Sequence, residues 1–260
     1  MILLIDVGNT RLKWAWLGSN ELSDQQAVVH RDVERDRWLA PLSAPAHKAS
    51  RVLVCNVAGA AMAKMLSDFA HGKFGIKPEF ISASRRYQQL TNAYLDPHLL
   101  GADRWLAVVG AWTRVHCALC VIDAGTAVKV DAVDAGGRHL GGLIVPGMRM
   151  MREALLNGTS DIAGAAHLST ASDAGILANN TQGAVSRGAE FALAGLADRA
   201  ADMIVKETGI EPKLLITGGD AALITATMRR RGEIVPDLVL QGLAAIASLA
   251  RPAPAPQGTS

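Results

Sequence analysis

The sequence predicts an α/β fold, because segments with the pattern of strand hairpins are followed by alternating helical and strand patterns. A second observation suggests two related halves. The chain opens on an apolar run and a glycine turn, LIDVGNTRLKW (4–14), and a similar segment, VIDAGTAVKVD (121–131), returns near its middle. The 260 residues are 50% hydrophobic, which is enough to bury a sizeable core in one large domain or in two small ones.

The individual elements follow from hydrophobic periodicity and from turn residues. Strands are expected at 1–6, 12–17, 51–57, 78–83, 119–125, 127–134, 140–147 and 213–220, the last running into a glycine turn. Helices are expected from 58 to about 71, at 100–115, 148–158 and 180–208, after 220, and within 237–250. Residues 41–50 have the composition of a loop, and the Pro-rich segment 251–260 is expected to be a disordered tail.

Composition excludes several classes of protein. A net charge of +2, from 26 basic and 24 acidic residues, gives no bias toward nucleic acid or membrane, and neither is expected as a partner. No targeting signal or long apolar span is found, so we expect a cytoplasmic protein. Cys117 and Cys120 form a C-x-x-C inside an apolar strand pattern, which predicts buried thiols. The short signatures of Walker A loops, Rossmann loops, zinc proteases and nucleophile elbows do not occur.

The repeated segment gives the first functional hypothesis. Asp6 is followed two residues later by Gly8, and Asp123 is followed in the same way by Gly125. The similarity is either a coincidence between two short hairpins or a duplicated phosphate-binding device. In the second case, backbone N–H groups at a glycine turn bind an anion, and the carboxylate beside them holds Mg²⁺ directly or through water. Two such hairpins facing each other would hold a nucleotide's phosphates from both sides.

Side chains around these turns leave alternatives open. Arg11 and Lys13 either contact phosphate or are solvated strand residues. The turn TGGD (217–220) is either a platform for adenine or ribose, or a tight turn in which Asp220 caps a helix. The basic run MRRRGE (228–233) is expected to complement a helix dipole rather than to bind nucleic acid.

The segment LGADRW (100–105) is predicted to be the start of a helix and not a strand hairpin. Its glycine opens the helix, and the first turn holds Asp103 and Arg104. Asp103 either offsets the helix dipole or accepts the proton of an attacking alcohol as a general base. Arg104 would bind a carboxylate with two parallel hydrogen bonds. Tyr94, one of two tyrosines, either donates a hydrogen bond or packs.

This arrangement resembles the superfamily of acetate and sugar kinases, heat-shock protein 70 and actin, and within it the type III pantothenate kinases. The matching stretches cover most of the chain: DVGNTRLKW (6–14), YLDPHLLGADRW (94–105), DAGTAVKVD (123–131), GGLIVPG (141–147), NNTQGA (179–184), TGGD (217–220) and DLVLQGL (237–243). The resemblance implies two ribonuclease H-like domains, each a mixed sheet flanked by helices, which we expect at 1–116 and 117–250. It also implies transfer of the ATP γ-phosphate to the primary hydroxyl of pantothenate, the first step of coenzyme A biosynthesis.

The resemblance also implies roles for particular residues. Residues expected to bind ATP and its phosphates are Asp6, Val7, Gly8, Asn9, Thr10, Arg11, Leu12, Lys13, Gly125 and Thr126. Those expected to bind pantothenate are Tyr94, Gly101, Ala102, Asp103 as the base, and Arg104. Thr181 would reach the pantothenate site of the partner in a homodimer. Mg²⁺ would accompany ATP, and Asp123 matches the position of a monovalent cation, K⁺ or NH₄⁺.

One residue departs from the family pattern, in which a small hydroxyl residue is expected near position 129. Lys129, beside Asp123, either replaces the monovalent cation or points outward. Two other functions remain as alternatives: another small-molecule kinase of the superfamily, or a regulatory protein of the Bvg accessory factor type that keeps the fold.

Dimerisation is also expected from an apolar helix face in the segment 100–115. This face holds Trp105, Leu106, Val109 and Trp112, and it offers more apolar surface than one small domain would be expected to cover.

Overall fold

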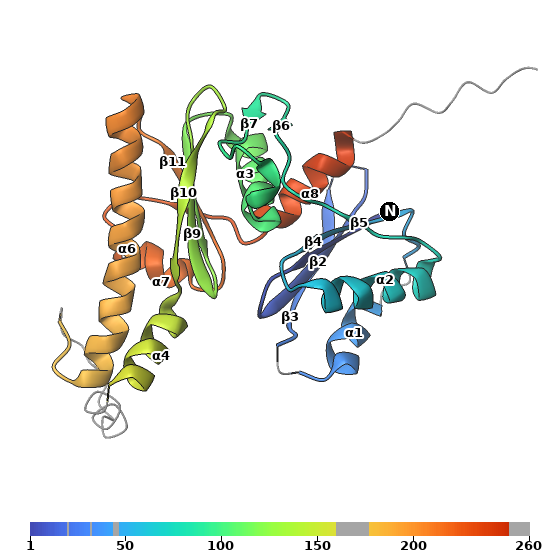
Figure 1. Ribbon diagram of the computed structural model, residues 1–260, viewed down its shortest axis with the longest axis horizontal. Coiled ribbons are helices and arrows are strands. Elements are labelled where there is room, and N and C mark those ends of the chain that lie inside the picture. The colour runs from blue at the N-terminus through green and yellow to red at the C-terminus, as the bar shows by residue number, and fades with distance from the viewer. Residues whose placement is uncertain (20, 32, 44–46, 160–176, 250–260) are drawn as a thin grey trace, which may run out of the picture.

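The computed structural model describes residues 1–19, 21–31, 33–43, 47–159 and 177–249. The predicted tail at 251–260 lies outside this part of the chain. The described residues form two five-stranded mixed sheets with helices on both faces of each, as the sequence predicts (Figure 1). The first sheet has the order β3-β2-β1-β4-β5 and the second the order β10-β9-β8-β11-β12.

The two sheets repeat one topology. In each, three antiparallel strands come first and two parallel strands are added on the other side. The first sheet contains β1 (Ile2–Val7), β2 (Arg11–Leu17), β3 (Leu22–Val29), β4 (Arg51–Asn56) and β5 (Glu79–Phe80). The second contains β8 (Leu119–Ala124), β9 (Ala127–Val133), β10 (His139–Pro146), β11 (Lys213–Thr217) and β12 (Glu233–Ile234). β1 and β8 are central and read as continuous apolar runs because both of their faces are covered.

Helices cover the outer face of each sheet and fill the space between the sheets. The outer face of the first sheet packs on α1 (Arg35–Ser43) and α2 (Ala60–Phe74). The outer face of the second packs on α4 (Met148–Gly158), α6 (Thr181–Thr208) and α7 (Ala221–Thr227). Between the sheets lie α3 (Ala102–Val115) and α8 (Leu238–Leu249) (Figure 1). A short hairpin, β6 (Arg86–Tyr87) and β7 (Leu90–Thr91), precedes α3.

The close crossing of α3 and α8 depends on two glycines. A Cβ atom on Gly110 would collide with the backbone of Leu238 and Gly242, and one on Gly242 would collide with the carbonyl of Leu106. The two backbones therefore approach more closely than any larger side chain would permit. The resulting core joins both sheets, since Leu53 and Val121 belong to the same buried cluster.

The apolar face of α3 does not form a dimer interface, contrary to the expectation from the sequence. The four residues of that face are buried inside the single chain, and none is more than 2% exposed. They pack in the cluster that α8 and the two sheets complete. The surface expected to contact a second copy is therefore used between the two sheets, and a dimer needs a different interface.

Several elements were not predicted: the two-residue strands β6, β7 and β12, and also strand β3 and helix α1. Strand β3 lacks the alternation of apolar and polar residues that predicts a strand, because it is an edge strand with mostly exposed side chains. Helix α1 extends into the segment 41–50 that we expected to be a loop, and it includes Pro41. Its buried Trp38 and Leu42 hold it against the first sheet. The predicted strand at 78–83 is real but short, covering only Glu79–Phe80.

The basic run at 228–233 also has a different explanation from the predicted one. It follows the end of α7 and lies against α6, where Asp198 accepts hydrogen bonds from the backbone N–H groups of Arg229 and Arg230. The side chain of Arg230 pairs with Asp202. These arginines therefore attach the α7–β12 connection to α6 instead of completing a helix dipole.

Two further expectations concern membranes and cysteines. No helix in the described ranges has the length and hydropathy needed to cross a bilayer. The three cysteines are free, and Cys55 and Cys120 are buried, whereas Cys117 is only partly so. Burial raises the pKa of Cys120 to about 12, so this thiol stays protonated, as expected of a structural residue.

Candidate active site

The first predicted phosphate hairpin is formed by β1 and β2. Asp6 lies directly opposite Lys13 in the register of these strands, and the turn closes with a hydrogen bond from the N–H of Gly8 to the carbonyl of Arg11. Asp6 is only 9% exposed. Lys13 does not bond to it but donates to the carbonyl of Pro236, which comes just before α8. The side chains of Val7 and Leu12 point into the core of the first sheet, leaving only their backbone for a ligand.

The second hairpin, β8 and β9, repeats this register, with Asp123 opposite Lys129. Its turn contains Gly125 and Thr126, and α4 begins directly on it, because the N–H of Gly147 donates to the carbonyl of Thr126 at 3.0 Å. A Cβ atom on Gly147 would collide with the carbonyls of Gly125 and Thr126. The start of α4 is therefore seated on the turn.

The two hairpins face each other across one cavity of about 320 Å³. Their tips touch, since the hydroxyls of Thr10 and Thr126 are 2.9 Å apart. The cavity is lined by Asp6, Gly8, Asn9, Thr10, Arg11, Lys13, Val57, Asp103, Asp123, Ala124, Gly125, Thr126, Ala127, Lys129, Arg149, Thr217, Gly218, Gly219, Asp220 and Val239. Residues far apart in the sequence thus meet where a nucleotide's phosphates were expected.

The turn TGGD (217–220) forms another wall of the cavity. Gly218 has a φ of +96°, and a side chain there would collide with the backbone of Ala124. The guanidinium of Arg11 lies against Gly219, so the first hairpin reaches across to this turn. Asp220 precedes α7, but its side chain makes no capping hydrogen bond. The capping alternative is therefore wrong for the side chain of Asp220.

The carboxyl of Asp6 has an unusual environment. Burial raises its pKa to about 7, the charges of Asp123 and Asp103 add to the rise, and Lys13 and Lys129 oppose it. A divalent cation would relieve this concentration of buried negative charge. Oxygen ligands suit Mg²⁺, which commonly binds one or two carboxylates together with substrate phosphates. Among the described residues, no group of three or more His, Cys, Asp or Glu side chains is arranged around a metal position.

Lys129 points inward and joins two parts of the site. Its Nζ donates to Oδ2 of Asp123 at 2.8 Å and to Oδ2 of Asp103 at 2.9 Å, and the lysine side chain is 21% exposed. Burial would lower the pKa of Lys129, but the two carboxylates outweigh it and raise the pKa. The alternative in which Lys129 points outward is therefore wrong.

Asp103 lies in the first turn of α3, as the sequence predicts. Its Oδ1 accepts from the N–H of Arg104 at 2.8 Å, while Oδ2 is held by Lys129. Gly101 caps the helix, and a Cβ there would lie 2.8 Å from Oδ1 of Asp103. Ala102, the first residue of α3, is partly exposed. The carboxylate thus faces the cavity between the hairpins at the helix N-terminus.

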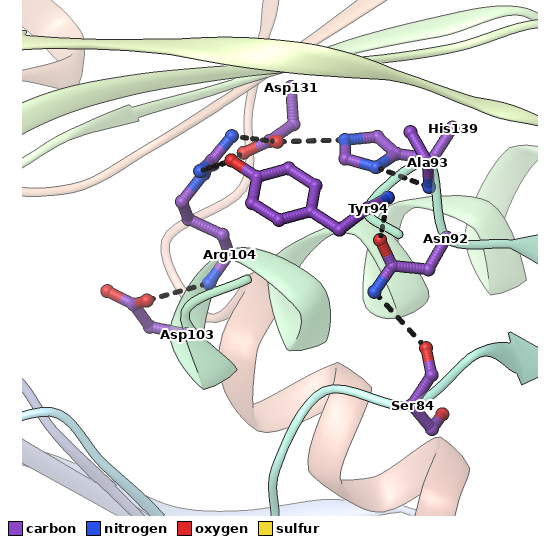
Figure 2. A network of polar contacts seen from close by, with 8 residues as sticks. All are labelled: Ser84, Asn92, Ala93, Tyr94, Asp103, Arg104, Asp131 and His139. Atoms are coloured by element: carbon purple, nitrogen blue, oxygen red, sulfur yellow. Dashed lines mark hydrogen bonds and ion pairs between the residues drawn. The ribbon is translucent and has the colours of Figure 1, made fainter. Parts of the chain in front are cut away.

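Arg104 has a different partner from the one we expected. Both of its parallel donors already bind a carboxylate of the chain: Nε donates to Oδ2 of Asp131 at 3.0 Å and Nη2 to Oδ1 at 2.7 Å (Figure 2). The predicted two-bond grip on a substrate carboxylate is therefore not available in this structure. The hydroxyl of Tyr94 accepts a hydrogen bond from Nη1 of Arg104 at 2.9 Å. The tyrosine therefore does more than pack, and toward Arg104 it is an acceptor.

Sequence reasoning missed Asp131 and His139, which complete this network (Figure 2). The signal was present in β9, where Lys129 and Asp131 are two residues apart and so share a face that is otherwise apolar. A charged residue on a covered strand face requires a partner. The partner cannot be read from the sequence, because Arg104 lies 27 residues away on a helix.

Thr181 lies apart from these residues, at the start of α6. The helix is capped by Asn180, whose side chain accepts from the N–H of Gly183 at 2.8 Å. Figure 1 shows that α6 begins beside α4, at the end of the molecule away from α3. Thr181 and Tyr94 are therefore not brought together within one chain.

The duplicated sheets, the facing hairpins and the third glycine turn define the class of protein by its fold, an actin-like arrangement of two ribonuclease H-like domains. Two solved structures share the fold. The activator of 2-hydroxyisocaproyl-CoA dehydratase from Clostridium difficile, with bound ADPNP, is 14% identical with a TM-score of 0.54, covering 98% of this chain and 99% of that one. Component A of (R)-2-hydroxyglutaryl-CoA dehydratase from Acidaminococcus fermentans is 17% identical with a TM-score of 0.55, covering 96% of each chain.

Sequence comparison narrows the class to one family. The family model described as type III pantothenate kinase matches residues 2–247. A type III pantothenate kinase of Nitrosococcus oceani is 38% identical over 252 residues, covering 95% of this chain and 94% of the relative. One from a Polaromonas species is 35% identical over 259 residues, covering 95% and 97%. The chain belongs to the type III pantothenate kinase family, and it is an ATP-dependent kinase.

Proposed function

We propose that this protein transfers the γ-phosphate of ATP to the primary hydroxyl of pantothenate in the cytoplasm. The observation that carries the proposal is the cavity between the hairpins, into which both glycine turns and the carboxylate of Asp103 open. This supports a direct transfer, in which a candidate base acts beside the proposed phosphate site and no covalent intermediate forms. Phosphoryl transfer depends mainly on positioning and on charge neutralisation, and the cavity offers both.

In this proposal the hairpins bind the nucleotide. The turn around Gly8, Asn9 and Thr10 and the turn around Gly125 and Thr126 present backbone N–H groups and hydroxyls to the phosphates. Arg11 and Lys13, which line the same cavity, supply positive charge. Asp6 would hold the Mg²⁺ that accompanies ATP, directly or through water, and bound Mg²⁺ would neutralise the phosphate charge that develops during transfer.

Asp103 is proposed to accept the proton of the attacking hydroxyl. Lys129 fixes one oxygen of the carboxylate, and the backbone N–H of Arg104 fixes the other. A base held in one direction needs no reorganisation when the alcohol attacks. Tyr94, Gly101, Ala102 and Arg104 would form the pantothenate pocket around it.

Lys129 supports a proposal about the monovalent cation. Its ammonium lies against Asp123, the position at which K⁺ or NH₄⁺ was expected, and a second carboxylate holds it there. We therefore propose that the charge of a monovalent cation is supplied in this protein by its own side chain.

We still propose a homodimer, now because of the position of Thr181 and not because of the apolar face of α3. Thr181 is remote from the pantothenate residues of its own chain, so it would serve that pocket only across an interface with a second copy. A two-fold dimer is expected in static light scattering at micromolar concentration. A fully active monomer would contradict it.

The test of the function is an assay of ADP release with a panel of small acids and alcohols, with and without K⁺ or NH₄⁺. Pantothenate is expected to give the highest kcat/KM. Turnover on a sugar, with no response to pantothenate, would assign the protein to another kinase of the superfamily.

A further inference from the structure

The cluster of Arg104, Asp131, His139 and Tyr94 lies between α3 and the second sheet, with Tyr94 partly buried and the other three buried (Figure 2). The side chains of Arg104 and Asp131 are 5% and 3% exposed. We propose that Asp131 and His139 are positioning residues for the acid substrate: they hold Arg104 in one orientation, so that its Nη1 group and the Tyr94 hydroxyl form the donor pair that receives the substrate. This inference rests on the proposed pantothenate site and adds two residues to it.

Both oxygens of the Asp131 carboxylate accept hydrogen bonds. Its Oδ1 accepts from Nη2 of Arg104 and from Nε2 of His139, at 2.7 and 2.9 Å, and its Oδ2 accepts from Nε of Arg104. Burial would raise the pKa of Asp131, but these hydrogen bonds and the guanidinium charge outweigh it and lower the pKa. An ionised, buried carboxylate with two fixed donors can hold a guanidinium in only one plane.

The side chain of His139 is 0% exposed. A carboxylate can only accept, so Nε2 of His139 is the donor to Asp131. Its Nδ1 faces the backbone N–H of Ala93 at 3.5 Å, which assigns the acceptor role to that nitrogen. The ring also stacks on Tyr94, with centroids 6.4 Å apart and planes 16° from parallel. His139 thus orients both Asp131 and the tyrosine ring.

The backbone of β10 packs closely against the network. A Cβ atom on Gly142 of β10 would collide with Nη2 of Arg104 and lie 2.6 Å from Oδ1 of Asp131. The strand therefore covers the ion pair directly, and a larger residue would displace it.

Two hydrogen-bond donors of this cluster remain for a ligand. Nη1 of Arg104 uses one N–H on Tyr94, and the tyrosine hydroxyl accepts that bond. The hydroxyl proton of Tyr94 is therefore free to be donated, beside the second N–H of Nη1. One donor belongs to the guanidinium of Arg104 and the other lies beside it. The positive charge favours an anionic acceptor such as a substrate carboxylate.

The test compares Asp131→Asn with Asp134→Asn, a matched control just beyond the same strand whose carboxylate pairs only with the local turn. We expect Asp131→Asn to raise KM for pantothenate by about 10- to 100-fold, the scale of a displaced positioning group, with KM for ATP unchanged. His139→Leu should act in the same direction. His139→Gln, which keeps a donor, should recover part of the loss. Asp134→Asn should match wild type.

A second readout is independent of turnover. In ¹⁵N-labelled protein, the Nε–H resonance of Arg104 should be protected from solvent exchange in wild type and in Asp134→Asn, and exposed in Asp131→Asn. Equal protection in all three proteins would overturn the proposal, as would a parallel rise in KM for ATP and pantothenate. If wild type turns over a different acid, the same variants are tested on that acid, which separates failure of the substrate assignment from failure of the positioning role.

Discussion

In the first hairpin Asp6 lies opposite Lys13, and in the second Asp123 lies opposite Lys129. The cross-strand pair is the same, yet the lysines behave differently. Lys13 donates to the carbonyl of Pro236, while Lys129 bridges Asp123 and Asp103. Asp6 is left buried with a pKa raised to about 7, mainly by desolvation.

The difference shows how one motif can serve two purposes. The carboxylate of the first hairpin keeps an unfavourable negative charge that an external cation would relieve. The carboxylate of the second already has an internal cation, because α3 brings Asp103 to the same lysine. The partner that each lysine meets in the fold, and not the hairpin sequence, decides which role the pair has.

The strongest way to test the comparison is to remove Asp103. Asp103→Asn keeps the shape but is a poor base, so turnover should fall by about 10²–10⁴-fold, with the low end expected if proton transfer is late in a loose transition state. ATP binding should barely change, because the hairpins hold the nucleotide. Asp6→Asn should instead weaken the dependence on Mg²⁺ as well as the rate.

The measurement is a Mg²⁺ titration of kcat for both variants, with ATP binding measured separately and Asp68→Asn on α2 as an exposed control. Near wild-type turnover in Asp103→Asn would remove this residue from the base role and leave it as a helix-start residue.

The pH dependence of stability should report the buried carboxyl of the first hairpin, Asp6. The pKa of Asp6 is about 7 in place of 3.8, so the folded protein binds more protons than the unfolded chain between these values. The stability that protonated Asp6 contributes to the folded protein is fully present below the unfolded pKa of 3.8. It is lost as the pH rises through the folded pKa of about 7. Relative to Asp6→Asn, wild type should lose up to about 4 kcal/mol of unfolding free energy.

This prediction is measured by urea denaturation at several pH values, with a chelator present and no nucleotide. Asp68→Asn should follow the wild-type profile. Parallel profiles for wild type and Asp6→Asn would show that Asp6 ionises normally.

Replacing each of the two lysines by threonine tests whether only Lys129 acts as an internal cation. Wild type should keep most of its turnover without K⁺ or NH₄⁺. Lys129→Thr should lose roughly 10- to 150-fold in their absence, since a hydrogen bond to a charged group contributes about 1.5–3 kcal/mol, and should regain activity when they are added. Lys13→Thr should show no such rescue. A wild-type enzyme that is inert without these cations would exclude the internal-cation role of Lys129.

The smallest expected effect is at the tips of the hairpins, where the hydroxyls of Thr10 and Thr126 meet. A double-mutant cycle with Thr10→Val and Thr126→Val should give a coupling of about 0.5–1.5 kcal/mol in thermal unfolding without nucleotide. A coupling indistinguishable from zero would mean that the two hairpins close independently of this contact.

Much of the fold could be predicted from local patterns. The apolar runs and glycine turns placed both hairpins, and α4 and α6 fall at or within one residue of the predicted ranges. Strand β3 and helix α1 were missed for a common reason. Their stability comes from the sheet edge and the core they pack against, and their own residues show little periodicity.

The sequence by itself determined which residues face each other within a hairpin. Alternation along a strand and a turn of fixed length are local properties, and they alone place Asp6 opposite Lys13 and Asp123 opposite Lys129. Only the tertiary structure decided which charges meet: Lys129 with Asp103, and Arg104 with Asp131, are contacts between separate elements 26 and 27 residues apart. Such contacts depend on how α3 lies between the two sheets, and that packing follows from the shape of the whole core, including the glycines at which α3 and α8 cross.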